Sequence, residues 1–171
     1  MEPIPSPAAS LAGRAFIFSV SSASSRSFPR TTPMIIRKSQ VETERNSKEG
    51  WGTVDTLRYS DAGALTHFGA SVQTLLPGAK SSIRHWHENT DEFLFVLSGE
   101  VTVTEDDGPH VLRPGDSACW PAGVPNGHTV SNKSSAPCAY LIVGTRVTND
   151  IGHYVDDVDL PPGSALGHEK Q

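Results

Sequence analysis

Residues 85–100 read HWHENTDEFLFVLSGE. Two histidines, His85 and His87, stand one residue apart at its start, and alternate side chains of a β-strand leave the same face. Glu92 opens the apolar run that follows, after a short polar turn. Because the two predicted strands are consecutive, we expect both imidazoles and the Glu92 carboxylate to converge on one point. Two imidazoles and a carboxylate suit a mononuclear divalent metal with open coordination positions.

The residues around the two histidines support this interpretation. Ile83, His85 and His87 share one face of the predicted strand, whereas Arg84 and Trp86 share the other. Two imidazoles on an otherwise apolar inward face are costly to bury without partners, and a metal ion supplies a partner.

The chain on both sides of this stretch predicts an all-β domain. From Val54 onward, short runs of period-two or continuous apolar character alternate with Gly, Pro and Asp turn signals. No segment keeps a 3.6-residue apolar period for three turns, which argues against a Rossmann fold or a helix bundle. Short strands in this number indicate a barrel or a sandwich. We expect strands at Val54–Tyr59, Leu65–Leu75, Ser82–His87, Glu92–Leu97, Glu100–Thr104, His110–Leu112, Ser117–Trp120, His128–Ser131 and Ala139–Val143.

The composition limits the kinds of protein that this chain can be. It has 171 residues, of which 36% are hydrophobic and 19% charged, and these values fit one domain with a tail. Apolar runs such as Phe93–Leu97 are far shorter than the ~20 residues that span a bilayer, so no transmembrane segment is predicted. Residues 34–171 carry 11 basic and 18 acidic side chains, and an acidic body without a basic stripe argues against nucleic-acid binding. The two cysteines, Cys119 and Cys138, lie in apolar runs and are expected to be buried, reduced thiols.

The first 33 residues differ from the rest. They contain eight Ser, five Pro and three Arg with one acidic residue, which predicts a disordered leader or an organelle transit peptide. A plain disordered extension and a translation start at Met34 remain alternatives. These alternatives predict that the protein is located in the cytoplasm or in mitochondria. We divide the remainder into an N-terminal extension (34–53), a barrel (54–146) and a C-terminal extension (147–171).

The spacing of glycines around the histidine pair resembles the first motif of the cupin superfamily. That motif is Gly, His-x-His, Glu and Gly, and here it corresponds to Gly78, His85, His87, Glu92 and Gly99. The chain departs from the motif in having six residues, not five, between Gly78 and His85. The second cupin motif is matched by Gly115, Pro121, Gly123 and Asn132.

The histidine of the second motif is displaced in this chain. Asn126 stands where the motif has its histidine, and His128 lies two residues further on. A shift of two residues along a strand preserves the face and moves the side chain by roughly 7 Å. We therefore predict His128 as the fourth metal ligand, with Asn126 as the alternative, either as an oxygen ligand or as a hydrogen-bond partner of a ligand. His67 is expected to be structural, and the other histidines are expected on the surface.

The resemblance covers Val54–Arg146 and implies a small single-domain cupin with a double-stranded β-helix, a jelly-roll barrel that holds a metal inside and often forms a homodimer. Nitrogen and oxygen ligands without thiolate fit Fe, Mn, Zn, Ni or Co as divalent ions. We expect a small metal-dependent enzyme, of dioxygenase or isomerase/lyase type, that acts on a small oxygenated molecule. The alternative is a non-catalytic cupin that binds a small ligand or holds a structural metal. No residue is assigned a catalytic role, and the candidate pocket residues are Gln73, Trp120, Asn126 and Tyr140.

Overall fold

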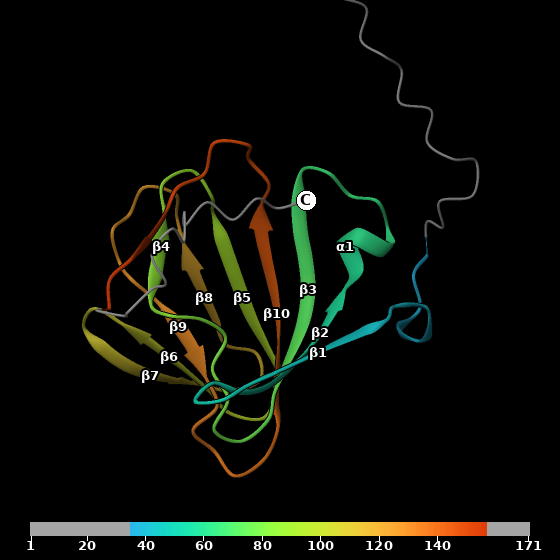
Figure 1. The fold of residues 1–171 in the computed structure, drawn as a ribbon, viewed down its shortest axis with the longest axis horizontal. Helices are drawn as coiled ribbons and strands as arrows, with labels where there is room; N and C mark the ends of the chain where they lie inside the picture. The colour runs from blue at the N-terminus through green and yellow to red at the C-terminus, as the bar shows by residue number, and fades with distance from the viewer. Residues whose placement is uncertain (1–34, 157–171) are drawn as a thin grey trace, which may run out of the picture. The chain divides into compact units, whose positions relative to one another are not determined.

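The computed structural model describes residues 35–156, and these form a β-structure with antiparallel pairing throughout (Figure 1). The predicted leader, residues 1–33, lies outside them. The strands are β1 (Thr43–Lys48), β2 (Gly52–Arg58), β3 (Phe68–Leu75), β4 (His85–His87), β5 (Glu92–Ser98), β6 (Val101–Glu105), β7 (Gly108–Leu112), β8 (Ser117–Trp120), β9 (Thr129–Ser131), β10 (Cys138–Thr145) and β11 (Gly152–Tyr154). Two short helices, η1 (Lys38–Gln40) and α1 (Tyr59–Ala62), complete the list, and neither is long or apolar enough to cross a membrane.

The strands form two walls. One is a six-stranded sheet in the order β1-β2-β3-β10-β5-β8, seen at the centre and right of Figure 1. The other combines the three-stranded sheet β7-β6-β9 with the pair β11-β4. A backbone bridge joins these two pieces, because His85 N donates to His128 O at 3.1 Å and His128 N donates to His85 O at 2.9 Å.

The core lies between the walls. Alternation along β5 buries Leu94 and Val96 completely, while Phe93 before them and Leu97 after them stay 38% and 45% exposed. The second wall contributes its own buried side chains from β6 and β9, namely Val101, Val103 and Val130. The all-β, double-stranded β-helix fold predicted from the sequence is confirmed.

Two strands were not predicted, and both lack an apolar period. All six residues of β1 are exposed, because this strand is the edge of its sheet and pairs only with β2. Polar and charged pairs hold it, including Arg45 to Asp55 at 2.7 Å. β11 has only three residues and pairs with β4. A strand that buries no apolar face carries no alternation to detect.

Other expectations are corrected. The strand predicted at Leu65–Leu75 begins at Phe68, because α1 and the turn at Gly63 occupy the preceding residues, and His67 is exposed ahead of the strand. Burial was predicted for both cysteines; it is wrong for Cys119, which is exposed, and right for Cys138, and both thiols are free.

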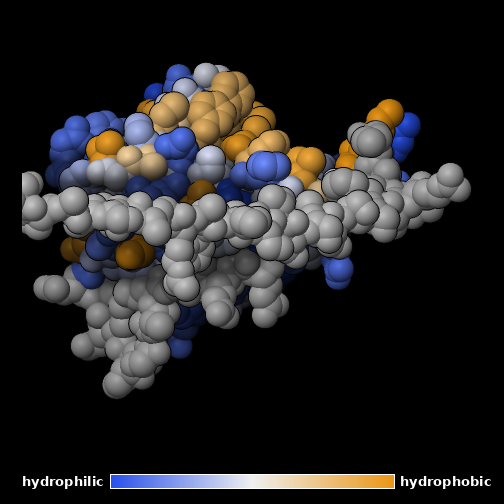
Figure 2. Space-filling model, turned by 90° about the horizontal axis from the view of Figure 1, so that it is seen from above, coloured by the Kyte–Doolittle hydropathy of each residue, from blue (hydrophilic) through white to orange (hydrophobic). Residues whose placement is uncertain are grey.

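The outward face of β3, β10, β5 and β8, which form one part of the large sheet, is largely apolar. Cys119 belongs to this face, because the alternation of β8 turns its neighbour Trp120 inward. The outward positions of β3, β10, β5 and β8 include no charged residue. A hollow of about 510 Å³ at one end of this face is lined by apolar side chains such as Phe68, Phe93 and Val143 and also by Asp91 and Glu92. Figure 2 shows apolar side chains gathered on one side of the molecule.

Gly99 allows a prediction about the turns that connect the walls. Gly99 and Gly78 both have positive φ, 72° and 81°. A Cβ on Gly99 would lie 2.7 Å from Pro137 O, whereas a Cβ on Gly78 would meet nothing within 4 Å. We expect Gly78→Ala to lower the free energy of unfolding by about 1–2 kcal/mol through backbone strain alone. Gly99→Ala should cost at least about 2 kcal/mol more, because the overlap adds to that strain. Urea denaturation of both variants measures the difference, and equal losses would contradict the steric argument.

Candidate metal centre

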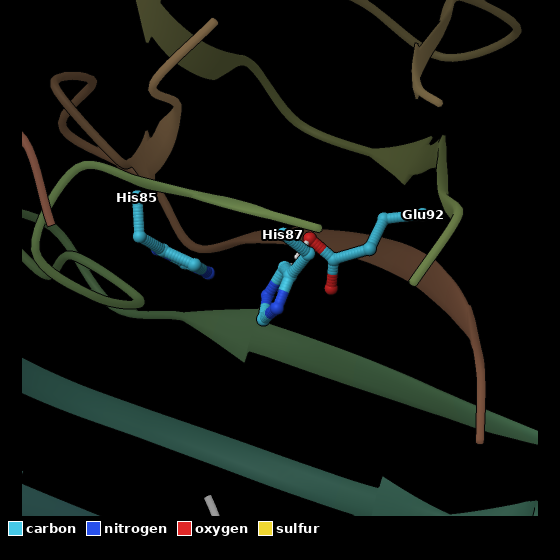
Figure 3. Close-up of side chains that lie close together, drawn as sticks. All are labelled: His85, His87 and Glu92. Carbon is cyan, nitrogen blue, oxygen red and sulfur yellow. Dashed lines mark ion pairs between the residues drawn. The ribbon is translucent and has the colours of Figure 1, made fainter. Parts of the chain in front are cut away.

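β4 carries His85 and His87 on one face. Between them, Trp86 points the other way and stacks on His153 of β11, with ring centroids 4.2 Å apart. Glu92 is the first residue of β5. Figure 3 shows both imidazoles and the carboxylate side by side, and one donor atom of each lies within 4.8 Å of the others. The three side chains that strand alternation was expected to bring together are neighbours in the structure.

His128 lies beside them, because its backbone pairs with that of His85. Its Nε2 is 3.0 Å from Oε2 of Glu92, and Nε2 of His87 is 3.7 Å from the same oxygen. The ring of His85 is 5.0 Å from the rings of both other histidines. Donor atoms bound at about 2.1 Å to one ion lie roughly 3.0–3.5 Å apart. The pairs of Glu92 with His128 and with His87 therefore lie close to the spacing of ligands on one ion, and His85 completes a group with His87 and Glu92.

The protonation of two histidines also fits a metal. Nδ1 of His87 is 2.6 Å from Oδ2 of Asp150, and Nδ1 of His85 is 2.8 Å from Ile83 O. Both partners are acceptors, so each Nδ1 carries a proton, and Nε2 is the nitrogen of each ring that is left to face a metal. Nε2 of His87 faces Oε2 of Glu92, and a proton or a metal ion between these two atoms would join them. This arrangement is the one that metal-binding histidines show.

His128 is held differently. It is 4% exposed, and its Nδ1 has no hydrogen-bond partner within residues 35–156. Trp120 stacks on its ring, with centroids 3.9 Å apart and planes 11° from parallel. The indole Nε1 of Trp120 donates to Oε1 of Glu105 at 2.6 Å, which fixes the indole in turn. Stacking therefore holds this imidazole in place, whereas hydrogen bonds at Nδ1 hold the other two.

The electrostatics favour the ligand forms of these groups. Burial lowers the pKa of His85, so the ring is neutral near pH 7. Burial raises the pKa of Glu92, but the hydrogen bond from His128 and the electrostatic interactions with His87, His128 and His85 outweigh it, and the net pKa is below its ordinary value. A neutral imidazole and an ionised carboxylate are the states that coordinate metals.

Two of the four pocket candidates, Gln73 and Tyr140, form one hydrogen-bonded row. The hydroxyl of buried Tyr140 donates to Oε1 of Gln73 at 2.5 Å and also interacts with Ser81. Ser81 and Ser82 hydroxyls are 3.4 Å apart, and Ser82 Oγ is 3.3 Å from Nδ1 of His85. The row therefore runs from the histidine cluster to β3.

The other two candidates have different places. Asn126 is not brought to the cluster, because its Oδ1 accepts from the backbone N of Asp106 at the β6–β7 turn, at 3.2 Å. Trp120 touches the cluster through His128. The sequence interpretation missed Asp150, which is 63 residues from His87 and follows no motif.

Comparisons with known proteins agree with this arrangement. Residues 71–144 match the family described as "Cupin domain". A solved structure described as a sugar phosphate isomerase from a cupin superfamily, from Silicibacter pomeroyi, is 37% identical, with a TM-score of 0.67 over 72% of this chain and 82% of that one. The chain belongs to the cupin superfamily.

Two curated proteins are also similar. Protein SchB of Streptomyces halstedii is 29% identical over 108 residues, which are 63% of this chain and 77% of that protein. Quercetin 2,3-dioxygenase of Bacillus subtilis is 30% identical over 92 residues. That match spans 52% of this chain but only 27% of the dioxygenase.

The cluster predicts how metal content depends on single side chains. We expect purified protein supplied in turn with Fe(II), Mn(II), Co(II), Ni(II) and Zn(II) to retain about one ion per chain of at least one of them. His85→Ala and Glu92→Ala should lose that ion, and His128→Ala should bind it more weakly. Asn126→Ala should bind as the wild type does, because Asn126 lies at another turn. Elemental analysis after desalting measures the content.

A matched control is His153→Ala. His153 also pairs with a carboxylate, Glu88 at 2.7 Å, but it stacks on Trp86 on the face of the strand pair that points away from the cluster. This control variant should retain the metal content of the wild type. A metal-free wild type would reject the centre, and unchanged affinity in His128→Ala would reject His128 as a ligand.

Proposed function

We propose that the protein is a divalent-metal-dependent isomerase that acts on a small polyhydroxylated carbonyl compound inside the barrel. The observation that carries the proposal is the cluster of three imidazoles and one carboxylate, in which the Nε2 atoms of His85 and His87 are preset as ligands. The similarity to a structure described as a sugar phosphate isomerase supports this reaction class, because it extends over 82% of that chain.

The residues of the site have different roles in this proposal. His85, His87, Glu92 and His128 would hold the metal. A bound divalent ion supplies Lewis acidity, which polarises a carbonyl oxygen and acidifies the neighbouring C–H bond. Trp120 holds the ring of His128 by stacking and covers that side of the centre with an apolar surface.

The row formed by Ser82, Ser81, Tyr140 and Gln73 supports a hydroxylated substrate. It starts 3.3 Å from a ligand histidine and offers hydroxyl and amide groups. Such groups both donate and accept hydrogen bonds, as sugar hydroxyls do. Burial raises the pKa of Tyr140 strongly, so its phenol stays protonated and serves as a donor.

A dioxygenase is the second candidate. The match to Quercetin 2,3-dioxygenase favours it, although the match covers about a quarter of that protein. Iron held by the same residues would supply the redox chemistry that a dioxygenase needs. A protein that binds a small molecule without turnover is the third possibility, because the described residues offer no obvious acid/base side chain beyond the cluster.

Turnover measurements test the proposed reaction. Protein loaded with each of the five metals is mixed with a panel of aldoses, ketoses and their phosphates, and proton NMR follows interconversion. We expect one class of substrate to be isomerised, with activity lost in Glu92→Ala. Gln73→Leu should raise KM by about tenfold with a smaller effect on kcat, because it removes one substrate hydrogen bond of about 1–1.5 kcal/mol.

An oxygen electrode run on the iron-loaded sample distinguishes the candidates. Substrate-dependent oxygen consumption without isomerisation would replace the isomerase by the dioxygenase. Binding of a small molecule without turnover or oxygen consumption would favour the third possibility, a protein that binds its ligand without catalysis.

We propose in addition that two copies pair through the outward face of β3, β10, β5 and β8. Its thirteen outward positions carry no charge. At about 4.8 Å between strands and about 3.4 Å per residue they cover roughly 430 Å² in projection. Because side chains protrude from the sheet, the accessible area is larger than this projected area and closer to the ~800 Å² per partner of a standard interface. A second copy presents the same uncharged face, so self-pairing leaves no charge unpaired.

Light scattering on a sizing column checks the pairing. We expect a dimer for the wild type and a monomer for Phe93→Glu, because a carboxylate would be buried without a partner. Val111→Glu is the matched control, since Val111 is 47% exposed on β7 of the other wall, and it should remain dimeric. A monomeric wild type at micromolar concentration would reject the interface.

A further inference from the structure

We propose that Asp150 is a positioning residue of the metal centre: its carboxylate fixes the tautomer and the orientation of the His87 ring, so that Nε2 of His87 is preset as a ligand. The proposal rests on the metal binding proposed above. It assigns a role to a residue in the segment after β10, which the sequence interpretation placed in a C-terminal extension.

The carboxylate is itself held at both oxygens. Oδ2 accepts from Nδ1 of His87 at 2.6 Å, and Oδ1 accepts from the backbone N of Asn89 at 3.1 Å. Both partners are well covered, since the side chain of His87 is 9% exposed and that of Asp150 is 17% exposed. A second bond, from Nδ2 of Asn89 to Asn149 O at 2.9 Å, holds the backbone that carries Asp150. With both oxygens occupied, the carboxylate cannot turn away from the imidazole without losing a bond.

The following strand keeps this segment against β4. β11 pairs with β4 so that Gly152 lies opposite His87, and Glu88 N donates to Ile151 O at 3.0 Å. A Cβ built on Gly152 would lie 3.6 Å from the His87 ring, so the backbone packs directly beside the imidazole. The segment thus contributes both a hydrogen-bond partner and a packing surface to one ligand.

The chemical consequence concerns which nitrogen faces the metal side. A free neutral imidazole exchanges its proton between Nδ1 and Nε2, and only the Nδ1–H form leaves Nε2 free to bind. An acceptor at Nδ1 selects that form and increases the electron density at Nε2. Removal of such a partner lowers metal affinity by about 10–100-fold.

The same two strands contain an internal control. His153 of β11 pairs with Glu88 at 2.7 Å, which is the same kind of bond at nearly the same length. This pair lies on the opposite face, because His153 stacks on Trp86, and its side chains are 41% and 40% exposed. Glu88→Gln therefore removes a His–carboxylate pair from the same ladder without touching the cluster.

The experiment measures metal affinity and not only turnover. Competition with a chromogenic chelator gives the Kd for Zn(II) and Co(II) in the wild type, Asp150→Asn, Glu88→Gln and His87→Ala. We expect Asp150→Asn to weaken binding by about 10–100-fold and to shift the absorption bands of bound Co(II), while Glu88→Gln leaves both unchanged. In a His87→Ala background, adding Asp150→Asn should change the Kd by less than about twofold, because the residue acts through His87.

Three results would overturn the proposal. Wild-type affinity in Asp150→Asn removes the role, and an equal loss with and without His87 shows a general structural effect. If Asp150→Asn does not keep the wild-type circular dichroism spectrum, ¹⁵N-histidine NMR of the wild type decides, and a proton on Nε2 of His87 rejects the proposal. A wild type that binds none of the metals would instead reject the metal function itself, which separates the two failures.

Discussion

The carboxylate of Glu92 is buried against the imidazoles of His87 and His128, and the folded domain has to satisfy that charge. An ionised carboxylate in the interior is costly without partners. Glu92 lies on β5, and its partners come from two other parts of the chain, β4 and the residue that precedes β9. The backbone bridge between His85 and His128 joins the two pieces of one wall at this point. The backbone pairing that joins the wall therefore also brings His128 to the cluster.

Around this cluster the structure uses a different support for each histidine. A backbone carbonyl holds His85, a carboxylate from the C-terminal segment holds His87, and an indole holds His128. Hydrogen bonds at Nδ1 select a tautomer, whereas stacking selects only an orientation. The first two imidazoles are thus preset as ligands, and the third remains bonded to Glu92. Such unequal support suits a centre in which one ligand moves when a metal arrives.

Several features could be predicted from the sequence because they depend on local periodicity. His85 and His87 share a face because strand side chains alternate, and β5 could be predicted because the short apolar run Phe93–Leu97 lies between turn signals. β1 was missed because an edge strand with every residue exposed has no such pattern. The wrong burial of Cys119 shows the limit of this reasoning, since an apolar run does not say which of its two faces points inward.

What the sequence by itself determined is the set of short strands, the turns between them and the pairing of two histidines with a carboxylate, because each follows from spacing within about ten residues. Only the tertiary structure decided that His128 and not Asn126 reaches the cluster, because the pairing of His85 with His128 sets that register. Only the tertiary structure places Asp150 beside His87, because 63 residues separate the two in the sequence. Contacts of this kind depend on which strands become neighbours, and no local pattern encodes that choice.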